Sequence, residues 1–194
     1  IGGSLTKNLT LPIVAAGTGA LLMAKNFDDS MRDVRATMGD ALGKTTKEAE
    51  ANFKALREEA IRLGATTAFS ASEAAAGMKE FAQVGWDTNQ ILNATEHALY
   101  AASASGEELG WTARTMAATM NKFGIEAKDA GKASDILVQA TNSSGMNMQE
   151  LAQALEYAGK ASYDAGNDLE QTSAILGIMA DQGLVGSKAG TALT

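Results

Sequence analysis

The chain has 194 residues and a formal net charge of −7, from 16 basic and 23 acidic side chains. An acidic chain without long basic runs lacks the clustered Lys and Arg that bind phosphate backbones, so nucleic-acid binding is not its expected main task. Cysteine is absent, which excludes disulfides and thiolate metal sites.

The composition favours helices over strands. Aromatic side chains make up 5% of the chain, Pro12 is the single proline, and Ala, Gly and Met are plentiful. Ala is the best helix former, and a proline costs little in a first helical turn. Because Ala with a few large side chains makes a thin core, we expect such an assembly to need a partner surface to be well ordered.

The first predicted element is an apolar helix. Residues 12–24 are apolar on all sides, and amphipathic helical spacing follows over residues 27–38. The continuous apolar run, residues 9–24, is shorter than the roughly 20 residues that cross a bilayer. We interpret this run as a buried or partner-contacting helix, with a membrane-active segment as the alternative.

This change of pattern divides the chain into two regions. Residues 1–43 are predicted to form the apolar lead-in helix and a linker, and residues 44–194 a core region of helical hairpins. We expect the sequence to be a piece of a longer chain, because it begins with Ile1 instead of Met and its last helix start is cut short at Thr194.

Capping signals mark the starts of the later helices. A polar residue followed three positions later by Glu or Gln matches a capping box, in which each side chain bonds to the other residue's backbone N–H. A series of such matches, followed by apolar stripes and terminal glycines, predicts short helices joined by tight turns. The pairs are Thr45 with Glu48, Ser70 with Glu73, Asp87 with Gln90, Ser105 with Glu108, Asn147 with Glu150, and Asn167 with Glu170.

Apolar stripes with helical spacing follow these starts. Apolar residues recur three and four positions apart, as on the buried face of an amphipathic helix, and no stretch has the alternation of a strand. In chain order the stripes begin at Ala49, Ala74, Ile91, Leu109, Ala130, Leu151 and Leu169. The predicted helix ends include Gly64, Gly85, Gly106, Gly124 and Gly183.

Three helix pairs repeat along the chain. Residues 70–102, 105–140 and 145–180 each follow the order cap, helix, glycine turn, cap, helix. The turns contain Gly85, Gly124 and Gly166. A repeat of about 35 to 40 residues is typical of stacked helical hairpins, each of which buries its apolar face against the next. We therefore predict an all-α fold of consecutive short helical hairpins in an elongated, repeat-like array.

No group of residues points to catalysis. His97 is the single histidine, so a histidine metal cluster or a His-dependent nucleophile lacks partners, and a solvated or half-buried side chain is expected. The adjacent Glu107 and Glu108 diverge on a helix and suit a helix N-terminus. Gly17 and Gly19 lack the third glycine of a dinucleotide loop. We predict no enzymatic activity, catalytic residue, cofactor or metal for this sequence.

Glycines inside helices give a packing signal. Gly77, Gly131 and Gly177 each cost about 1 kcal/mol relative to Ala in a helix, so we expect them to let another backbone approach closely. Glycines four residues apart, such as Gly186 and Gly190, are interpreted as caps and turns.

Large apolar side chains give the candidate interface. Trp86 and Trp111 lie next to helix ends, where core anchoring is the first interpretation and a protein interface the second. The candidate interface residues are Leu11, Pro12, Ile13, Val14, Leu21, Leu22, Trp86 and Trp111.

Several segments resemble the core region of phage tail tape measure proteins. The first, residues 65–86, contains Gly77-Met-Lys-Glu-Phe-Ala-Gln-Val-Gly-Trp86. Further matches are residues 101–109, 121–131 and 178–193, with a similar lead-in over residues 3–12. The matches span nearly the whole chain in the order expected for this family.

The resemblance implies a structural virion protein inside the phage tail. Members of the family act as scaffold and ruler for the polymerising tail tube, and they leave the tail when DNA is delivered. The resemblance also implies synthesis in the host cytoplasm, self-association, often as a trimer, and contacts with the tube protein, the tail-tip hub and distal tail proteins. No specific nucleic acid is expected as a partner. The alternative is a membrane-active helical protein that forms part of a DNA-delivery channel, with the host membrane as a partner.

Overall fold

The computed structural model describes the backbone of residues 3–194 and the side chains of residues 21–194. Helices and short 3₁₀ turns make up the regular structure of this part, and no strand occurs in it, which confirms the predicted all-α fold. The elements are α1 (Gly3–Met38), η1 (Gly39–Leu42), α2 (Thr46–Thr66), α3 (Ala71–Gln83), α4 (Thr88–Ser105), α5 (Leu109–Lys122), η2 (Ala127–Asp129), α6 (Ala130–Asn142), α7 (Met148–Asp164), α8 (Leu169–Asp181) and α9 (Gly186–Leu193).

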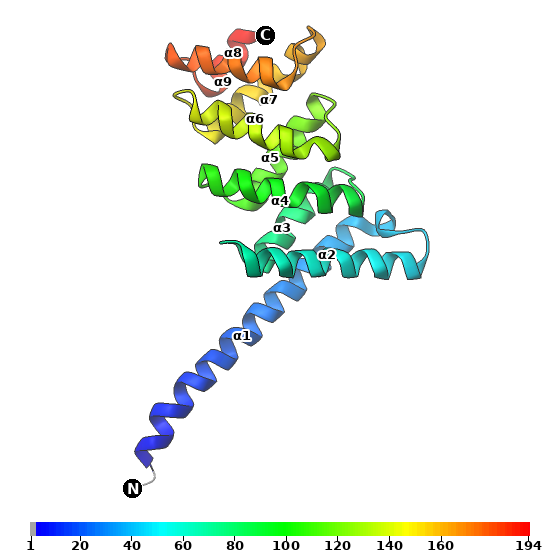
Figure 1. The fold of residues 1–194 in the computed structure, drawn as a ribbon, viewed down its shortest axis with the longest axis vertical. Helices are drawn as coiled ribbons and strands as arrows, with labels where there is room; N and C mark the ends of the chain where they lie inside the picture. Colours follow the sequence, from blue (N-terminus) through cyan, green and yellow to red (C-terminus); the bar gives the residue numbers. More distant parts are fainter. Residues whose placement is uncertain (1–2) are drawn as a thin grey trace.

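The helices form a stack in two layers. Helices α1, α3, α5, α7 and α9 contact one another in succession in one layer, and α2, α4, α6 and α8 do so in the other. Consecutive helices also contact each other across the layers from α2 onward. The stack rises from α2 to α8 and α9, while the N-terminal part of α1 projects from it at the opposite end (Figure 1). The predicted elongated array of helical hairpins is therefore confirmed.

Local hydrogen bonds explain where most helices begin and turn. Complete capping boxes start α3, α4 and α7, at Ser70, Asp87 and Asn147, as predicted. The predicted turn glycines between paired helices have positive φ angles, 85° at Gly85, 63° at Gly124 and 94° at Gly166. Such angles favour glycine because it has no Cβ to clash with the backbone.

Two other capping predictions need correction. The side chain of Thr45 accepts from the N–H of Glu48, but the Glu48 carboxylate accepts from Lys44 instead of Thr45, so the box is only half formed. The box before α8 lies one residue later than predicted, with Asp168 paired to Gln171. In both places the predicted helix forms and only the cap differs.

The predicted cap at Ser105 is wrong. Ser105 is the last residue of α4, and its hydroxyl donates to the carbonyl of Ala101 over 2.8 Å. Helix α5 starts after Glu108, which makes no side-chain cap bond. A serine in a last helical turn can bond back to the carbonyl four residues earlier, so its side chain does not cap the next helix.

Helix α2 also continues past the predicted end at Gly64, to Thr66.

One hydrophobic core runs through the whole stack. It extends from Phe27 in α1 to Ala189 in α9 and takes an alanine from every helix after α1. The largest fully buried side chains, among them Phe81, Met116 and Leu151, come from the predicted stripes. The core crosses residue 43, and the predicted division of the chain at that residue stays a prediction.

Candidate functional site

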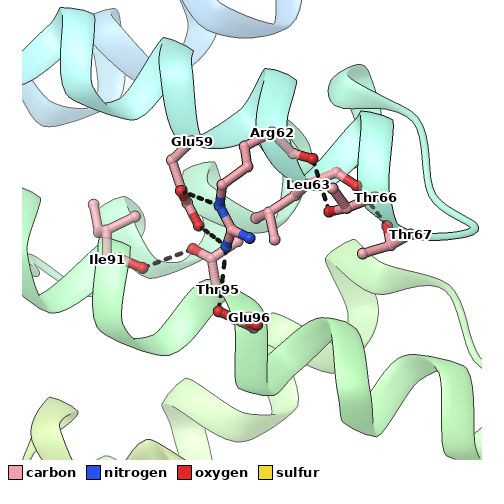
Figure 2. Close-up of polar contacts among 8 residues, drawn as sticks. All are labelled: Glu59, Arg62, Leu63, Thr66, Thr67, Ile91, Thr95 and Glu96. Carbon is pink, nitrogen blue, oxygen red and sulfur yellow. Dashed lines mark hydrogen bonds and ion pairs between the residues drawn. The ribbon is translucent and has the colours of Figure 1, made fainter.

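Polar contacts between neighbouring helices of the same layer, such as α2 with α4 and α3 with α5, recur along the surface of the stack. Arg62 of α2 donates to Glu59 of its own helix over 2.8 and 2.6 Å and to Glu96 of α4 over 3.2 Å (Figure 2). These hydrogen bonds, first with Glu59 and then with Glu96, raise the pKa of Arg62 above its ordinary value. Exposed ion pairs add little free energy, so their contribution is to align neighbouring helices.

Similar bridges recur further along the stack. Arg114 of α5 donates to both carboxylate oxygens of Glu80 on α3 over 2.8 and 3.0 Å, and the ammonium of Lys132 on α6 lies 3.9 Å from Glu170 on α8. Lys122 of α5 donates to backbone carbonyls of α7 instead, and burial lowers the pKa of its side chain. In each layer, polar contacts at the surface thus connect neighbouring helices.

The glycines inside helices adjoin side chains more often than backbone. A Cβ at Gly77 would lie 3.1 Å from the side chain of Leu109, and one at Gly131 would lie 2.9 Å from the ring of the exposed His97. At Gly177 the nearest atom is the Cβ of Ser144, at 3.4 Å. The prediction that these three glycines admit another backbone is therefore wrong, because they accept protruding side chains of neighbouring helices.

Backbone contact occurs at Gly190. A Cβ there would lie 2.6 Å from the carbonyl oxygen of Ala154, so α9 rests directly on the backbone of α7. The sequence interpretation of Gly186 and Gly190 as caps and turns holds for Gly186, which has a φ of 57°. It is wrong for Gly190, which lies inside α9.

The two tryptophans have different surroundings. Trp86 is only 7% exposed, and its ring stacks on that of Phe81 with 4.8 Å between the ring centres. This is the core position that was its first interpretation. Trp111 is half-buried and packs against the core, and it also lines a shallow surface groove with Arg114 and Gln149. An interface role for either residue stays a prediction.

The projecting part of α1 carries the other predicted interface residues. Leu21, Leu22 and Met23 are 72%, 60% and 73% exposed. Leu11, Pro12, Ile13 and Val14 lie in α1, but their side chains are outside the described residues. Among the described residues, no helix combines the length and the apolar character that a membrane crossing requires. Three consecutive exposed apolar side chains make this part of α1 a candidate contact surface.

A groove on the even-numbered layer is the second candidate surface. It has a volume of about 770 Å³ and lies over α6, between Tyr100 of α4 and Ile178 of α8, which are 55% and 67% exposed. Gly177 contributes to the opening, since the equivalent ninth position of α6 carries the buried Val138. The sequence interpretation missed this groove. Its signals were an apolar residue on the outer face of each flanking helix and a glycine where the preceding unit has a valine.

The side chains of the groove include few charges and no arrangement suited to catalysis. Asp135, Glu170 and Asp181 contribute three carboxylates against the single ammonium of Lys132. Within the part of the chain that the structure describes, no three His, Cys, Asp or Glu side chains lie together as a metal site would require. The groove is therefore a surface hollow with an acidic margin.

Comparisons with known proteins agree on one family. Residues 57–194 match the phage-related minor tail protein family. The whole chain is 35% identical over 196 residues to the tape measure protein of Pneumococcus phage Dp-1, of which it covers 16%. Over 92% of its length it is 30% identical to the probable tape measure protein of Escherichia phage P2, of which it covers 22%. The chain thus spans less than a quarter of either relative, and no solved structure matches it.

Proposed function

The chain belongs to the phage-related minor tail protein family, and we propose that it is a segment of a tail tape measure protein that serves as scaffold and ruler for the tail tube. The observation that supports this role most is the similarity along the whole chain to a phage tape measure protein. The fold suits it, because a two-layer stack of helices has a length proportional to the number of its units.

We further propose that the segment lies inside the tail tube or at its tip, in several copies, often three, held by hub and distal tail proteins and released when DNA is delivered. The net charge of −7 suits a protein that occupies the tail together with DNA and does not bind the DNA. A stack in which each unit contacts mainly its neighbours can also open unit by unit, which would ease release. The residues present suggest no enzymatic activity for this segment.

Tail length in assembled phages tests the ruler role. An in-frame deletion of helical residues outside this segment should shorten the tail in proportion, because a helix rises about 1.5 Å per residue, or about 90 Å for 60 residues. Electron microscopy of the assembled tails measures the difference. A deletion that leaves the tail length unchanged would count against a ruler.

Deletion of the segment itself separates the scaffold role from the ruler role. If residues 57–194 anchor the protein to the tip, their removal should abolish tail assembly, whereas removal of an equal number of residues elsewhere should only shorten the tail. The tail proteins retained in a pull-down from a phage lysate give a second readout. If both deletions give tails that assemble correctly and are only shorter, a special role for this segment is excluded.

A further inference from the structure

The projecting part of α1 and the groove over α6 are complementary in charge. Residues 3–26 contain Lys7 and Lys25 and no acidic residue, so this part of α1 is apolar and basic. The groove is flanked by the exposed side chains of Tyr100 and Ile178, and its lining combines apolar residues with polar ones and three carboxylates. An apolar helix with positive charge is the kind of ligand that a groove of this character binds.

A buried hydroxyl beneath the groove has no hydrogen-bond partner among the described residues. Ser134, the fifth residue of α6, donates to the carbonyl of His97 on α4 over 3.0 Å. Ser173, the fifth residue of α8, is equally buried, but its hydroxyl has no hydrogen-bond partner in the described structure. Buried polar groups are nearly always paired. The α6–α8 contact therefore lacks the hydrogen bond that Ser134 forms between α6 and α4.

The α1 helix of the same molecule is badly placed to fill its own groove. It leaves the stack beside α2, whereas the groove lies near α8 at the other end (Figure 1). A second copy has no such restriction. Its α1 would bring Leu21 and Leu22 into the groove, with Lys25 on the same face of the helix and close to Asp135 or Asp181.

We infer that the projecting part of α1 of one copy binds in the α4–α6–α8 groove of another copy. The contact is heterologous, since one molecule supplies the helix and the other the groove, and it leaves a free groove and a free helix at the two ends of every pair. Such contacts generate rings or open chains of molecules. This inference rests on the two surfaces alone and does not depend on the proposed role in phage tails.

Two variants with one surface disabled in each test the contact. Leu21→Asp with Leu22→Asp places charge on the α1 surface, and Ile178→Asp does so in the groove. Each substitution falls on an exposed side chain, so the fold should persist, which circular dichroism checks. Ile61→Asp is the matched control, because Ile61 is an exposed apolar residue of α2 outside both surfaces.

Sedimentation velocity and light scattering then give the mass of each sample. The unaltered chain and the Ile61 variant should gain mass as concentration rises, and each disabled variant alone should stay monomeric. A mixture of the two disabled variants should double its mass, since one intact groove meets one intact helix. Raising the ionic strength from about 0.1 M to about 1 M shortens the Debye length from about 10 Å to about 3 Å and should weaken the binding.

Other occupants give different results. If α1 helices bind one another, the groove variant alone will associate as the unaltered chain does, which overturns the inference. If the unaltered chain stays monomeric and α1 binds vesicles of anionic lipid instead, the occupant is not a second copy and the inference is likewise overturned. A mixture of the disabled variants that stays monomeric contradicts the heterologous contact directly.

Discussion

The two parts of α1 differ in how far their apolar side chains are buried. Met31 and Val34 are completely buried against the stack, whereas Leu21, Leu22 and Met23, only two or three turns earlier, are exposed. The difference follows from neighbours, since α3 lies against the later part of the helix and Figure 1 shows no helix beside the earlier part. An apolar stripe in the sequence thus identifies a helix face that can be buried. The arrangement of the other helices determines whether it is buried within the same molecule.

Truncation of a core side chain in α1 should have the largest effect on stability. Met31→Ala removes a fully buried side chain and is expected to cost about 2–5 kcal/mol in the free energy of unfolding, because the core loses contacts and gains a cavity. Met23→Ala, in the exposed part of the same helix, should stay within about 0.5 kcal/mol. Urea denaturation of the monomer measures both. Equal losses would show that the earlier part of α1 is covered within one molecule.

Added methyl groups at two glycines should have opposite effects. Gly190→Ala places a Cβ against the backbone of α7 and should cost about 1–3 kcal/mol, as overpacking does. Gly177→Ala meets Ser144 only at an ordinary contact distance and should gain about 1 kcal/mol from helix propensity. Thermal unfolding of both variants measures the difference. A neutral Gly190 variant would mean that α9 can move off α7 without loss.

Loss of a helix cap should have a smaller effect. Asp87→Ala removes a side chain that completes a capping box at α4, and the expected cost is about 1 kcal/mol. Glu108→Ala is the control, because Glu108 occupies the same position before α5 without a cap bond. Similar losses for the two variants would contradict the assignment of these caps.

The pH dependence of stability should show the smallest effect. Hydrogen bonds from Ser70, first from its backbone N–H, lower the pKa of Glu73 below its ordinary value of 4.5. A lowered folded-state pKa stabilises the protein above pH 4.5, and this contribution disappears as the pH falls through the folded-state pKa. Glu73→Gln should flatten this part of the stability profile between pH 5 and the acid transition. An unchanged profile would show that the carboxylate is not bonded in solution.

The sequence predicts local features of this fold better than contacts between units. The boxes at Ser70, Asp87 and Asn147 form because both partners lie within one helical turn, so no distant residue is involved. The same motif fails at Ser105, where α4 extends far enough to include the serine. The motif alone cannot show where the preceding helix ends.

The candidate surfaces were only partly predictable. The exposed Leu21 and Leu22 belong to an apolar run that the sequence identifies. Trp86 is a core residue, as its first interpretation had it, because Phe81 lies against its ring. The groove depends on how closely α8 approaches α6, and this distance is set by side chains almost 40 positions apart in the chain. Periodicity within single helices carries no information about such contacts.

Residue-resolved hydrogen exchange of the monomeric chain tests the central claim, that order in α1 depends on the stack beneath it. The backbone amides of residues 31–38 should exchange as slowly as those of α3, because they open only when the stack does. Those of residues 21–26 should exchange on the order of 100-fold faster, through local opening. Uniform protection along α1 at a concentration where the chain is monomeric would contradict the account.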